Sequence, residues 1–343
     1  MTNGNAVAGS HGAANEKPLL EIEDLWVEYR TSGGTVKAVN GLNMNVLMGE
    51  TLGFVGETGA GKSTTAFSVM RILPEPPSKI VKGRISYQGT DLLGLGNKQM
   101  RMVRGKEIAM IFQDPMTSLD PVKTVVHQIQ EMISLHENLS RTEARARAED
   151  MLEVVGIKRE RANDYPHQFS GGMKQRVVIA IALSCNPKLL IADEPTTALD
   201  VTIQAQVLEL MKKLKAEYRM SMIMITHDLG VVAEICDRVA VMYAGNVVER
   251  GTTVDVFESP LHPYTRALFD AVPDIEGEKH VLKVISGTAH NPTRLPSGCP
   301  FHPRCPLVRD VCKSRTPRDI EVTPGHRTSC FLHDDDLKEE TNR

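Results

Sequence analysis

The sequence predicts an α/β fold with an antiparallel β portion near its start, a helical insert in its middle and a small irregular domain at its end. Three observations lead to this prediction. A glycine-rich run at 56–64 follows an apolar strand-like segment and precedes a helix-like one. Strand-like runs alternate with helical patterns as far as residue 258. Beyond that point cysteine and proline replace the periodicity, so a separate irregular unit is expected at 259–332.

The length and charge of the chain limit the number of domains and the classes of partner that can be expected. The 343 residues exceed one ordinary hydrophobic core, so two domains or one large domain with an appendage are expected. Lysine and arginine total 40 against 43 acids, and an acidic tail at 333–343 accounts for the whole net charge of −3. The neutral remainder lacks the basic surplus of nucleic-acid-binding proteins, so no nucleic-acid partner is predicted. No apolar run approaches the roughly 20 residues that span a bilayer, so any membrane role is expected through partners.

The strand-like segments divide into an early group and a late group. Residues 1–18 are small and polar without periodicity, which predicts a disordered leader. The early segments have no crossover helices between them and are therefore expected to pair antiparallel. The later segments alternate with helices, as in a parallel sheet. The expected strands are 20–23, 25–29, 36–46, 51–55, 84–87, 108–112, 189–192, 222–225 and 239–243.

Helical periodicity dominates 122–182 and predicts a helical subdomain at about 115–182. Ser140 and Glu143 form a capping-box pattern at the start of one helix, and Gly156 is positioned to end it. The apolar residues between them lie on one helix face, which is expected to be buried: Ala144, Ala148, Met151, Leu152 and Val155.

The glycine-rich run fits the pattern G-x-x-x-x-G-K-[ST], which predicts a nucleoside triphosphate site. Its glycines let successive N–H groups point at phosphate oxygens, and the following helix directs its positive end at the same anion. Lys62 is expected to neutralise the β- and γ-phosphates, Ser63 to reach Mg²⁺ and Thr64 to reach the α-phosphate. The predicted cofactors are therefore ATP and Mg²⁺. The expected loop residues are Gly56, Glu57, Thr58, Gly59, Ala60, Gly61, Lys62, Ser63 and Thr64.

Two adjacent carboxylates follow the apolar segment at 189–192. Asp193 is expected to bind Mg²⁺ through water or to hold Ser63, and Glu194 to orient the attacking water or accept its proton. A solvated acidic turn is the structural alternative, and the presence of the phosphate loop favours the catalytic interpretation.

A second anion-binding helix end is predicted where Ser170, Gly171 and Gly172 open a helix. The run 169–176, FSGGMKQR, lies shortly before the acidic pair and resembles the signature sequence of ATP-binding cassette (ABC) ATPases. It departs from the commonest form of that signature at Phe169 and Met173, whereas the serine and glycines that would contact phosphate are intact.

Further elements of the ABC ATPase family occur in the expected order across 19–251. Tyr29 matches the aromatic residue that stacks on adenine, Gln113 the glutamine loop and His227 the switch histidine. The run 198–200 matches the dimer-contact loop, which places Asp200 at the nucleotide. Each residue has a structural alternative in the core or in a turn, and the shared order favours the functional one.

The resemblance implies an ATPase of the ABC fold, with a RecA-like phosphate-loop core, whose ATPase domain covers 19–258. Lys62, Gln113, Glu194 and His227 would carry catalysis, and Gln113 would join Ser63 and Asp193 in binding Mg²⁺. In such ATPases the signature of one subunit closes over ATP held by the phosphate loop of another. Because this chain contains one of each, ATP hydrolysis is expected only in a dimer.

Two segments of the end region are similar to the C-terminal extension of oligopeptide and dipeptide importer ATPase subunits: 259–268, SPLHPYTRAL, and 299–306, CPFHPRCP. The resemblance implies a peripheral protein on the cytoplasmic face of the inner membrane that energises peptide import. It implies two transmembrane permease subunits, an extracytoplasmic peptide-binding protein and a second ABC ATPase subunit, more often a different chain than a copy. Importers of nickel, glutathione or other small solutes are the alternative, followed by non-transport ABC ATPases acting on DNA or translation.

The region contains four cysteines, at 299, 305, 312 and 330. Disulfides are disfavoured in the absence of a secretory signal, so these cysteines are interpreted as a metal site. Their spacing lacks the short C-x₂-C of many zinc modules. Four thiolates can hold a [4Fe–4S] cluster, which the resemblance also implies. Zinc, with His302 or His326 as further ligands, and the absence of any metal remain alternatives. The expected ligands are Cys299, Cys305, Cys312 and Cys330.

Overall fold

The structure is a computed structural model that describes residues 17–197, 199–271, 285, 287–288 and 290–335. The leader predicted at 1–18 lies outside the described residues except for 17–18, and the acidic tail predicted at 333–343 except for 333–335. In the part of the chain that the structure describes, no helix has the length and apolar character needed to cross a membrane.

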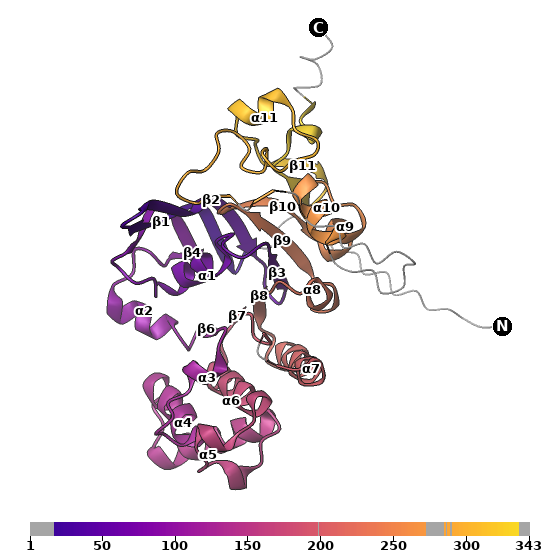
Figure 1. The fold of residues 1–343 in the computed structure, drawn as a ribbon. Coiled ribbons are helices and arrows are strands. Elements are labelled where there is room, and N and C mark those ends of the chain that lie inside the picture. The colour runs from indigo at the N-terminus through magenta and orange to yellow at the C-terminus, as the bar shows by residue number, and fades with distance from the viewer. Residues whose placement is uncertain (1–16, 198, 272–284, 286, 289, 336–343) are drawn as a thin grey trace, which may run out of the picture.

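A small antiparallel sheet forms the first layer and confirms the antiparallel portion predicted near the start (Figure 1). The segments expected at 20–23 and 25–29 are one strand, which is interrupted by a register shift around Asp24, where φ is 44°. The strands, in spatial order, are β2 (Gly34–Val46), β1 (Leu20–Thr31), β4 (Ser78–Tyr87) and β5 (Thr90–Asp91).

A larger mixed sheet forms the centre of the molecule. Its strands β9, β3, β8, β7 and β6 are parallel, and three further strands continue it antiparallel beyond β9. The spatial order is β11 (Ile320–Thr323), β12 (His326–Thr328), β10 (Asn246–Thr252), β9 (Arg238–Tyr243), β3 (Thr51–Val55), β8 (Ser221–Ile225), β7 (Leu189–Asp193) and β6 (Ile108–Ile111). Strands β5, β10, β11 and β12 had not been predicted.

Helices cover the large sheet and gather at one end of the molecule (Figure 1). The helices α3, α4, α5 and α6 lie together below the sheets in this view. Ser140 caps α5 through its capping box with Glu143, as predicted. The α-helices are α1 (Lys62–Met70), α2 (Asn97–Val103), α3 (Pro115–Ser118), α4 (Val125–His136), α5 (Arg141–Val154), α6 (Gly171–Leu183), α7 (Val201–Tyr218), α8 (Leu229–Ile235), α9 (Thr253–Glu258), α10 (Pro263–Asp270) and α11 (Asp310–Ser314).

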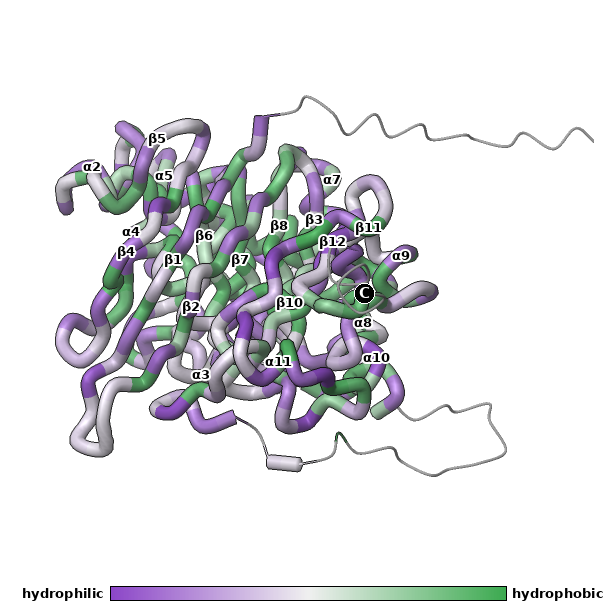
Figure 2. The backbone as a smooth tube through the Cα atoms, turned by 90° about the horizontal axis from the view of Figure 1, so that it is seen from above, coloured by the Kyte–Doolittle hydropathy of each residue, from purple (hydrophilic) through white to green (hydrophobic). Residues whose placement is uncertain are grey.

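The parallel strands are buried on both faces, which explains their continuous apolar runs. Along β8, Ile223 and Ile225 point into the core shared with the antiparallel sheet and α1, whereas Met222 and Met224 point into the core shared with the helices. Figure 2 shows the hydrophobic character of β7 and β8 in the interior. These strands place their carboxyl ends, and the loops that follow, on one edge of the sheet.

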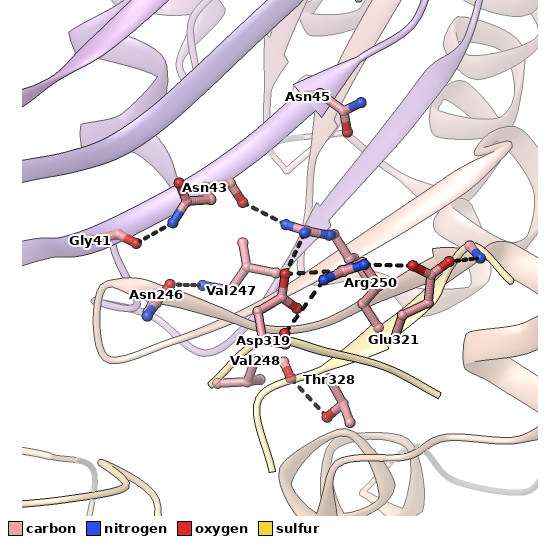
Figure 3. A network of polar contacts seen from close by, with 12 residues as sticks. Gly41, Asn43, Asn45, Asn246, Val247, Val248, Arg250, Asp319, Glu321 and Thr328 are labelled. Atoms are coloured by element: carbon pink, nitrogen blue, oxygen red, sulfur yellow. Dashed lines mark hydrogen bonds and ion pairs between the residues drawn. The ribbon is translucent and has the colours of Figure 1, made fainter. Parts of the chain in front are cut away.

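The C-terminal region joins the large sheet through β12 and a polar network around β10 (Figure 3). Arg250 on β10 donates to Asp319 Oδ2 at 2.6 Å and to the backbone oxygen of Asn43 on β2 at 2.9 Å. Arg327 on β12 donates to the same oxygen of Asp319 at 3.0 Å and to Glu321 at 2.7 Å. The end region is therefore tied both to the central sheet and to the antiparallel one.

Glu249 on β10 is a buried carboxylate that also holds the end region in place. The residue is 1% exposed. Its oxygens accept hydrogen bonds from the backbone N–H groups of Leu261 and His262, both at 2.7 Å, and from Nε2 of His326 at 2.9 Å. A carboxylate that is buried and hydrogen-bonded in this way is costly to remove, because its donors are left without an acceptor.

We expect Glu249→Ala to lower the free energy of unfolding by about 3–5 kcal/mol, since two backbone N–H groups and a histidine lose their buried acceptor. Urea denaturation followed by circular dichroism measures this loss. Glu258→Ala is the matched control, because Glu258 is exposed at the end of the adjacent helix and should change stability by less than about 0.5 kcal/mol. Equal stability of the two variants would show that Glu249 does not hold the end region.

Candidate active site

The glycine-rich loop connects the end of β3 to the start of α1, as the sequence predicted. Gly56 has φ of 150°, and a Cβ there would lie 2.2 Å from the backbone oxygen of Met242. Gly61 has φ of 107°, and a Cβ would lie 2.4 Å from the backbone oxygen of Ala38. Only glycine fits these two positions, because any side chain would collide with backbone atoms of neighbouring strands.

Lys62 opens α1 and is 7% exposed. Its Nζ donates to the backbone oxygens of Gly56 at 2.7 Å and Glu57 at 3.1 Å, so the ammonium lies inside the curve of the loop. Burial lowers the pKa of Lys62, and the nearby Glu194, Asp193 and Glu57 oppose that shift. A phosphate arriving here would meet a cation that the loop already holds in position.

The hydroxyl of Ser63 donates to Oδ1 of Asp193 at 3.1 Å. Asp193 is the last residue of β7 and is 3% exposed. Burial raises the pKa of Asp193, and the hydrogen bond from Ser63 opposes this shift. The two oxygen-bearing side chains that were predicted to share Mg²⁺ are therefore in direct contact.

Two candidate residues from separate loops, Gln113 and His227, meet at the carboxylate of Glu194. Gln113 Nε2 donates to Glu194 Oε2 at 2.9 Å, and Nδ1 of His227 lies 3.4 Å from Glu194 Oε1. Thr197 also donates to Oε2 at 2.9 Å, a contact that the sequence did not predict. Glu194 has φ of 47°, and its N–H donates to the backbone oxygen of Ile225 at 2.8 Å. This anchor turns its carboxylate away from the strand and toward the loop.

A cavity of about 550 Å³ opens above the phosphate loop. Tyr29, the aromatic residue predicted to stack on adenine, lines this cavity, and its hydroxyl lies 3.4 Å from Oγ1 of Thr64. Pro292 also lines this cavity, although no sequence signal pointed to it. The backbone oxygen of Pro292 accepts a hydrogen bond from the N–H of Lys37 on β2 at 2.9 Å, which brings the end region to the cavity wall. The lining residues are Tyr29, Val36, Ala38, 58–64, Gln113, Glu194, His227 and Pro292.

The signature residues lie outside this cavity. Ser170 caps α6 by accepting a hydrogen bond from the N–H of Met173, and Gly171 and Gly172 form the first turn. A Cβ at Gly172 would lie 2.4 Å from Ile203 on α7, so this glycine also permits close packing of the two helices. Asp200 caps α7 by accepting from the N–H of Ile203 at 3.0 Å. Ala198 of the predicted dimer-contact loop lies outside the described residues.

The four clustered cysteines line a second, small cavity of about 20 Å³, which we call the four-cysteine chamber. All of them are free thiols. Burial and the neighbouring thiols raise the pKa of Cys299 to about 11 and that of Cys330 to about 12. His302 lines the chamber, whereas His326 does not, because it pairs with Glu249. Among the described residues, no three side chains of His, Cys, Asp or Glu form a group that could hold a metal ion.

The fold and the site together define the class of this protein as an ABC-type ATPase. A family model described as "ABC transporter" matches residues 39–197, and a second, described as "Oligopeptide/dipeptide transporter, C-terminal region", matches residues 248–312.

Curated relatives match nearly the whole chain. It is 48% identical over 325 residues to the oligopeptide transport ATP-binding protein AppD of Bacillus subtilis, covering 94% of this chain and 99% of that one. It is 50% identical over 315 residues to OppD of Escherichia coli, covering 91% and 93%. A solved dimer of the ATP-binding cassette MJ0796 bound to ADP and Pi matches with a TM-score of 0.62 and 27% identity, covering 68% of this chain and 98% of that one. This chain belongs to the family of oligopeptide and dipeptide transport ATP-binding proteins.

Proposed function

We propose that this protein is the ATP-hydrolysing subunit that energises the import of dipeptides or oligopeptides through a membrane permease. One observation carries the proposal: a phosphate loop with its acidic pair is joined, in one chain, to a C-terminal region of the oligopeptide/dipeptide transporter type. Relatives about 50% identical over nine-tenths of both chains are named as transport ATP-binding proteins for such peptides.

The proposed chemistry is transfer of the γ-phosphoryl group of ATP to water. Lys62 and the loop N–H groups would hold the phosphates and stabilise the charge that spreads over the transferring group. Glu194 would orient the attacking water and accept its proton, because its carboxylate faces the loop from the edge of the same cavity. His227 and Gln113 contact Glu194 and would fix its direction. Tyr29, which lines the same cavity, would stack on the adenine.

Ser63, Asp193 and Gln113 provide hydroxyl, carboxylate and amide oxygens, the donor set that Mg²⁺ prefers, and the first two are already in contact. When bound there, Mg²⁺ would neutralise charge on the β- and γ-phosphates.

We infer that hydrolysis requires two facing ATPase subunits. The helix end formed by Ser170, Gly171 and Gly172, which would attract an anion, does not line the nucleotide cavity of its own chain. Facing subunits would place this helix end and Asp200 against the ATP held by the partner. A second, related ATPase chain is the proposed partner, together with two transmembrane permease subunits, a peptide-binding protein outside the membrane and a position on the cytoplasmic face of the inner membrane.

Purification from the native membrane, with mass spectrometry of the bound chains, tests this function. We expect a permease pair and a second ABC ATPase to co-purify, and the complex reconstituted in liposomes to import labelled peptide only with ATP. Nickel or glutathione transport by the same complex would move the substrate assignment to those solutes. Ribosomal or DNA-repair partners without a permease would contradict the transport function and leave the ATPase site standing.

We also propose that the four-cysteine chamber holds a [4Fe–4S] cluster. Its donors are the thiols that such clusters require, and apolar side chains surround them, including Phe301, Leu307 and Phe331. A single zinc ion needs sulfur atoms within about 4 Å of one another, because tetrahedral Zn–S bonds are about 2.3 Å long. No such group of three ligands occurs among the described side chains, so the proposal rests on the four thiols and their apolar surroundings alone.

We expect protein purified without oxygen to contain iron and acid-labile sulfide, and Cys312→Ser to lose most of both, since removal of one ligand weakens the cluster. Elemental analysis and visible absorption measure the content. Cys185→Ala is the control, because Cys185 is buried in the core far from the chamber lining and should leave the iron content unchanged. Zinc without iron, or neither metal, in the wild-type protein would show that the cluster proposal is wrong.

A further inference from the structure

Arg304, which belongs to the C-terminal region, forms an ion pair with the phosphate loop. Its side chain is 6% exposed, and its two terminal nitrogens donate to the two carboxylate oxygens of Glu57, at 2.7 Å and 2.9 Å. This two-pronged pairing fixes both position and orientation of the carboxylate, because the guanidinium is planar. Glu57 is the second residue of the loop, so the C-terminal region contacts the loop directly through this ion pair.

Tyr264 on α10 forms a hydrogen bond with the backbone of Glu57. Its hydroxyl accepts a hydrogen bond from the N–H of Glu57 at 2.9 Å, and its ring is fully buried. The side chain and the backbone of Glu57 are thus both held by residues that follow the ATPase core in sequence. The carbonyl oxygen of Glu57 in turn accepts a hydrogen bond from Lys62. A displacement of Glu57 would therefore displace an acceptor that positions Lys62.

Arg304 lies in a tight turn between two cysteines of the chamber. The N–H of His302 donates to the backbone oxygen of Cys299 at 3.0 Å, and the N–H of Arg304 donates to that of Phe301 at 2.9 Å. Phe301 is 1% exposed and packs against the rings of Tyr243 and Tyr264. Cys305, which follows Arg304 directly, lines the chamber with Cys299. One packed turn therefore contacts the chamber on one side and the phosphate loop on the other.

We propose that Arg304 is a positioning residue that couples the four-cysteine chamber to ATP binding through Glu57. The coupling rests on the proposed assignment of 56–64 as the ATP phosphate loop and adds a regulatory input to it. Any change at Cys299 or Cys305, such as metal loss or thiol modification, would shift the turn and with it the guanidinium that holds Glu57. Because coupling between two sites is reciprocal, ATP binding must also alter the chamber.

The first arm of the test is steady-state ATP hydrolysis by the full assembly, with the KM and kcat measured separately. We expect Arg304→Ala to raise the KM for ATP about 10-fold, within the usual range of coupling between sites, and to change kcat by less than about 3-fold. Arg304→Lys keeps the charge without the planar guanidinium, so its KM for ATP should lie between those of the wild type and Arg304→Ala. Arg315→Ala is the matched control, since Arg315 is an exposed arginine of the same region.

Glu57→Gln removes the ion pair from the loop side and leaves the C-terminal region intact, so it separates coupling from misfolding of that region. If the pair carries the coupling, the double variant Glu57→Gln with Arg304→Ala should be no worse than the more severe single variant. Effects that simply multiply would show that the two residues act independently, which would overturn the proposal.

The second arm measures the chamber rather than turnover. The full-length protein, prepared without metal in the chamber, is treated with a maleimide in the presence and absence of a non-hydrolysable ATP analogue, and mass spectrometry follows the labelling rates of Cys299 and Cys305. We expect the analogue to change these rates several-fold in the wild type and not in Arg304→Ala. Rates that do not respond to nucleotide in the wild type would contradict the coupling.

Lys62→Ala distinguishes a failure of the Arg304 coupling from a failure of the assignment of 56–64 as the ATP phosphate loop. If Lys62→Ala loses nucleotide binding while the Arg304 variants behave as wild type in both arms, the phosphate-loop assignment stands and the coupling is wrong. If Lys62→Ala binds ATP normally, the assignment of the loop is wrong and the coupling falls with it.

Discussion

Replacement of Glu194 by glutamine is expected to reduce ATP turnover by about 10²–10⁴-fold, the usual contribution of a general base. The amide keeps the shape of the side chain and its contacts with Gln113 and Thr197, but it cannot accept a proton from water. Nucleotide binding should persist, because the phosphate contacts of Lys62 and the loop are untouched. The variant is therefore expected to accumulate as an ATP-bound dimer, visible as a larger species in size-exclusion chromatography with ATP.

The matched control for this variant is Glu217→Gln, since Glu217 is an exposed carboxylate near the end of α7. It should hydrolyse ATP at the wild-type rate and form no trapped dimer. Turnover by Glu194→Gln within a few-fold of wild type would show that another group activates the water. A monomer that nevertheless hydrolyses ATP normally would contradict the two-subunit arrangement of the site.

The second large effect is expected from Lys62→Ala, which should weaken ATP binding by about 10²-fold and reduce turnover at least as much. Charge-assisted hydrogen bonds contribute about 1.5–3 kcal/mol each, and Lys62 is placed to make them to two phosphates. Burial of the Lys62 ammonium carries a desolvation cost, which also lowers its pKa. Because Lys62→Ala removes that cost, the folded state should tolerate the change. Isothermal titration with ATP measures the affinity, and thermal denaturation checks the fold.

Lys62→Met keeps the aliphatic stem and removes only the charge, so it should be as defective as Lys62→Ala. Lys98→Ala, a change at an exposed lysine on α2, is the control that should bind ATP normally. If Lys62→Met retained tight binding, the side chain would act by packing, and the phosphate role would be wrong.

Much of the fold was predictable because its signals are local. The loop at 56–64 needs glycine where the backbone passes neighbouring strands, and that need is visible in the sequence. The capping box of Ser140 and Glu143 lies within one helical turn, and buried parallel strands such as β7 have short apolar runs. Strand β10 escaped prediction because its sequence, NVVERGT, contains charges, and only the structure shows that Glu249 is buried against partners from later in the chain.

The candidate site divides in the same way. The sequence by itself determined which residue types could bind and cleave a nucleotide, because the glycines, Lys62 and the acidic pair are fixed by local spacing. Only the tertiary structure brought Gln113 and His227 to Glu194, placed Pro292 at the nucleotide cavity and joined Arg304 to Glu57. The physical reason is that these contacts form between segments far apart in sequence, where packing of the sheet and burial of paired charges decide which side chains meet, and no local pattern records that outcome.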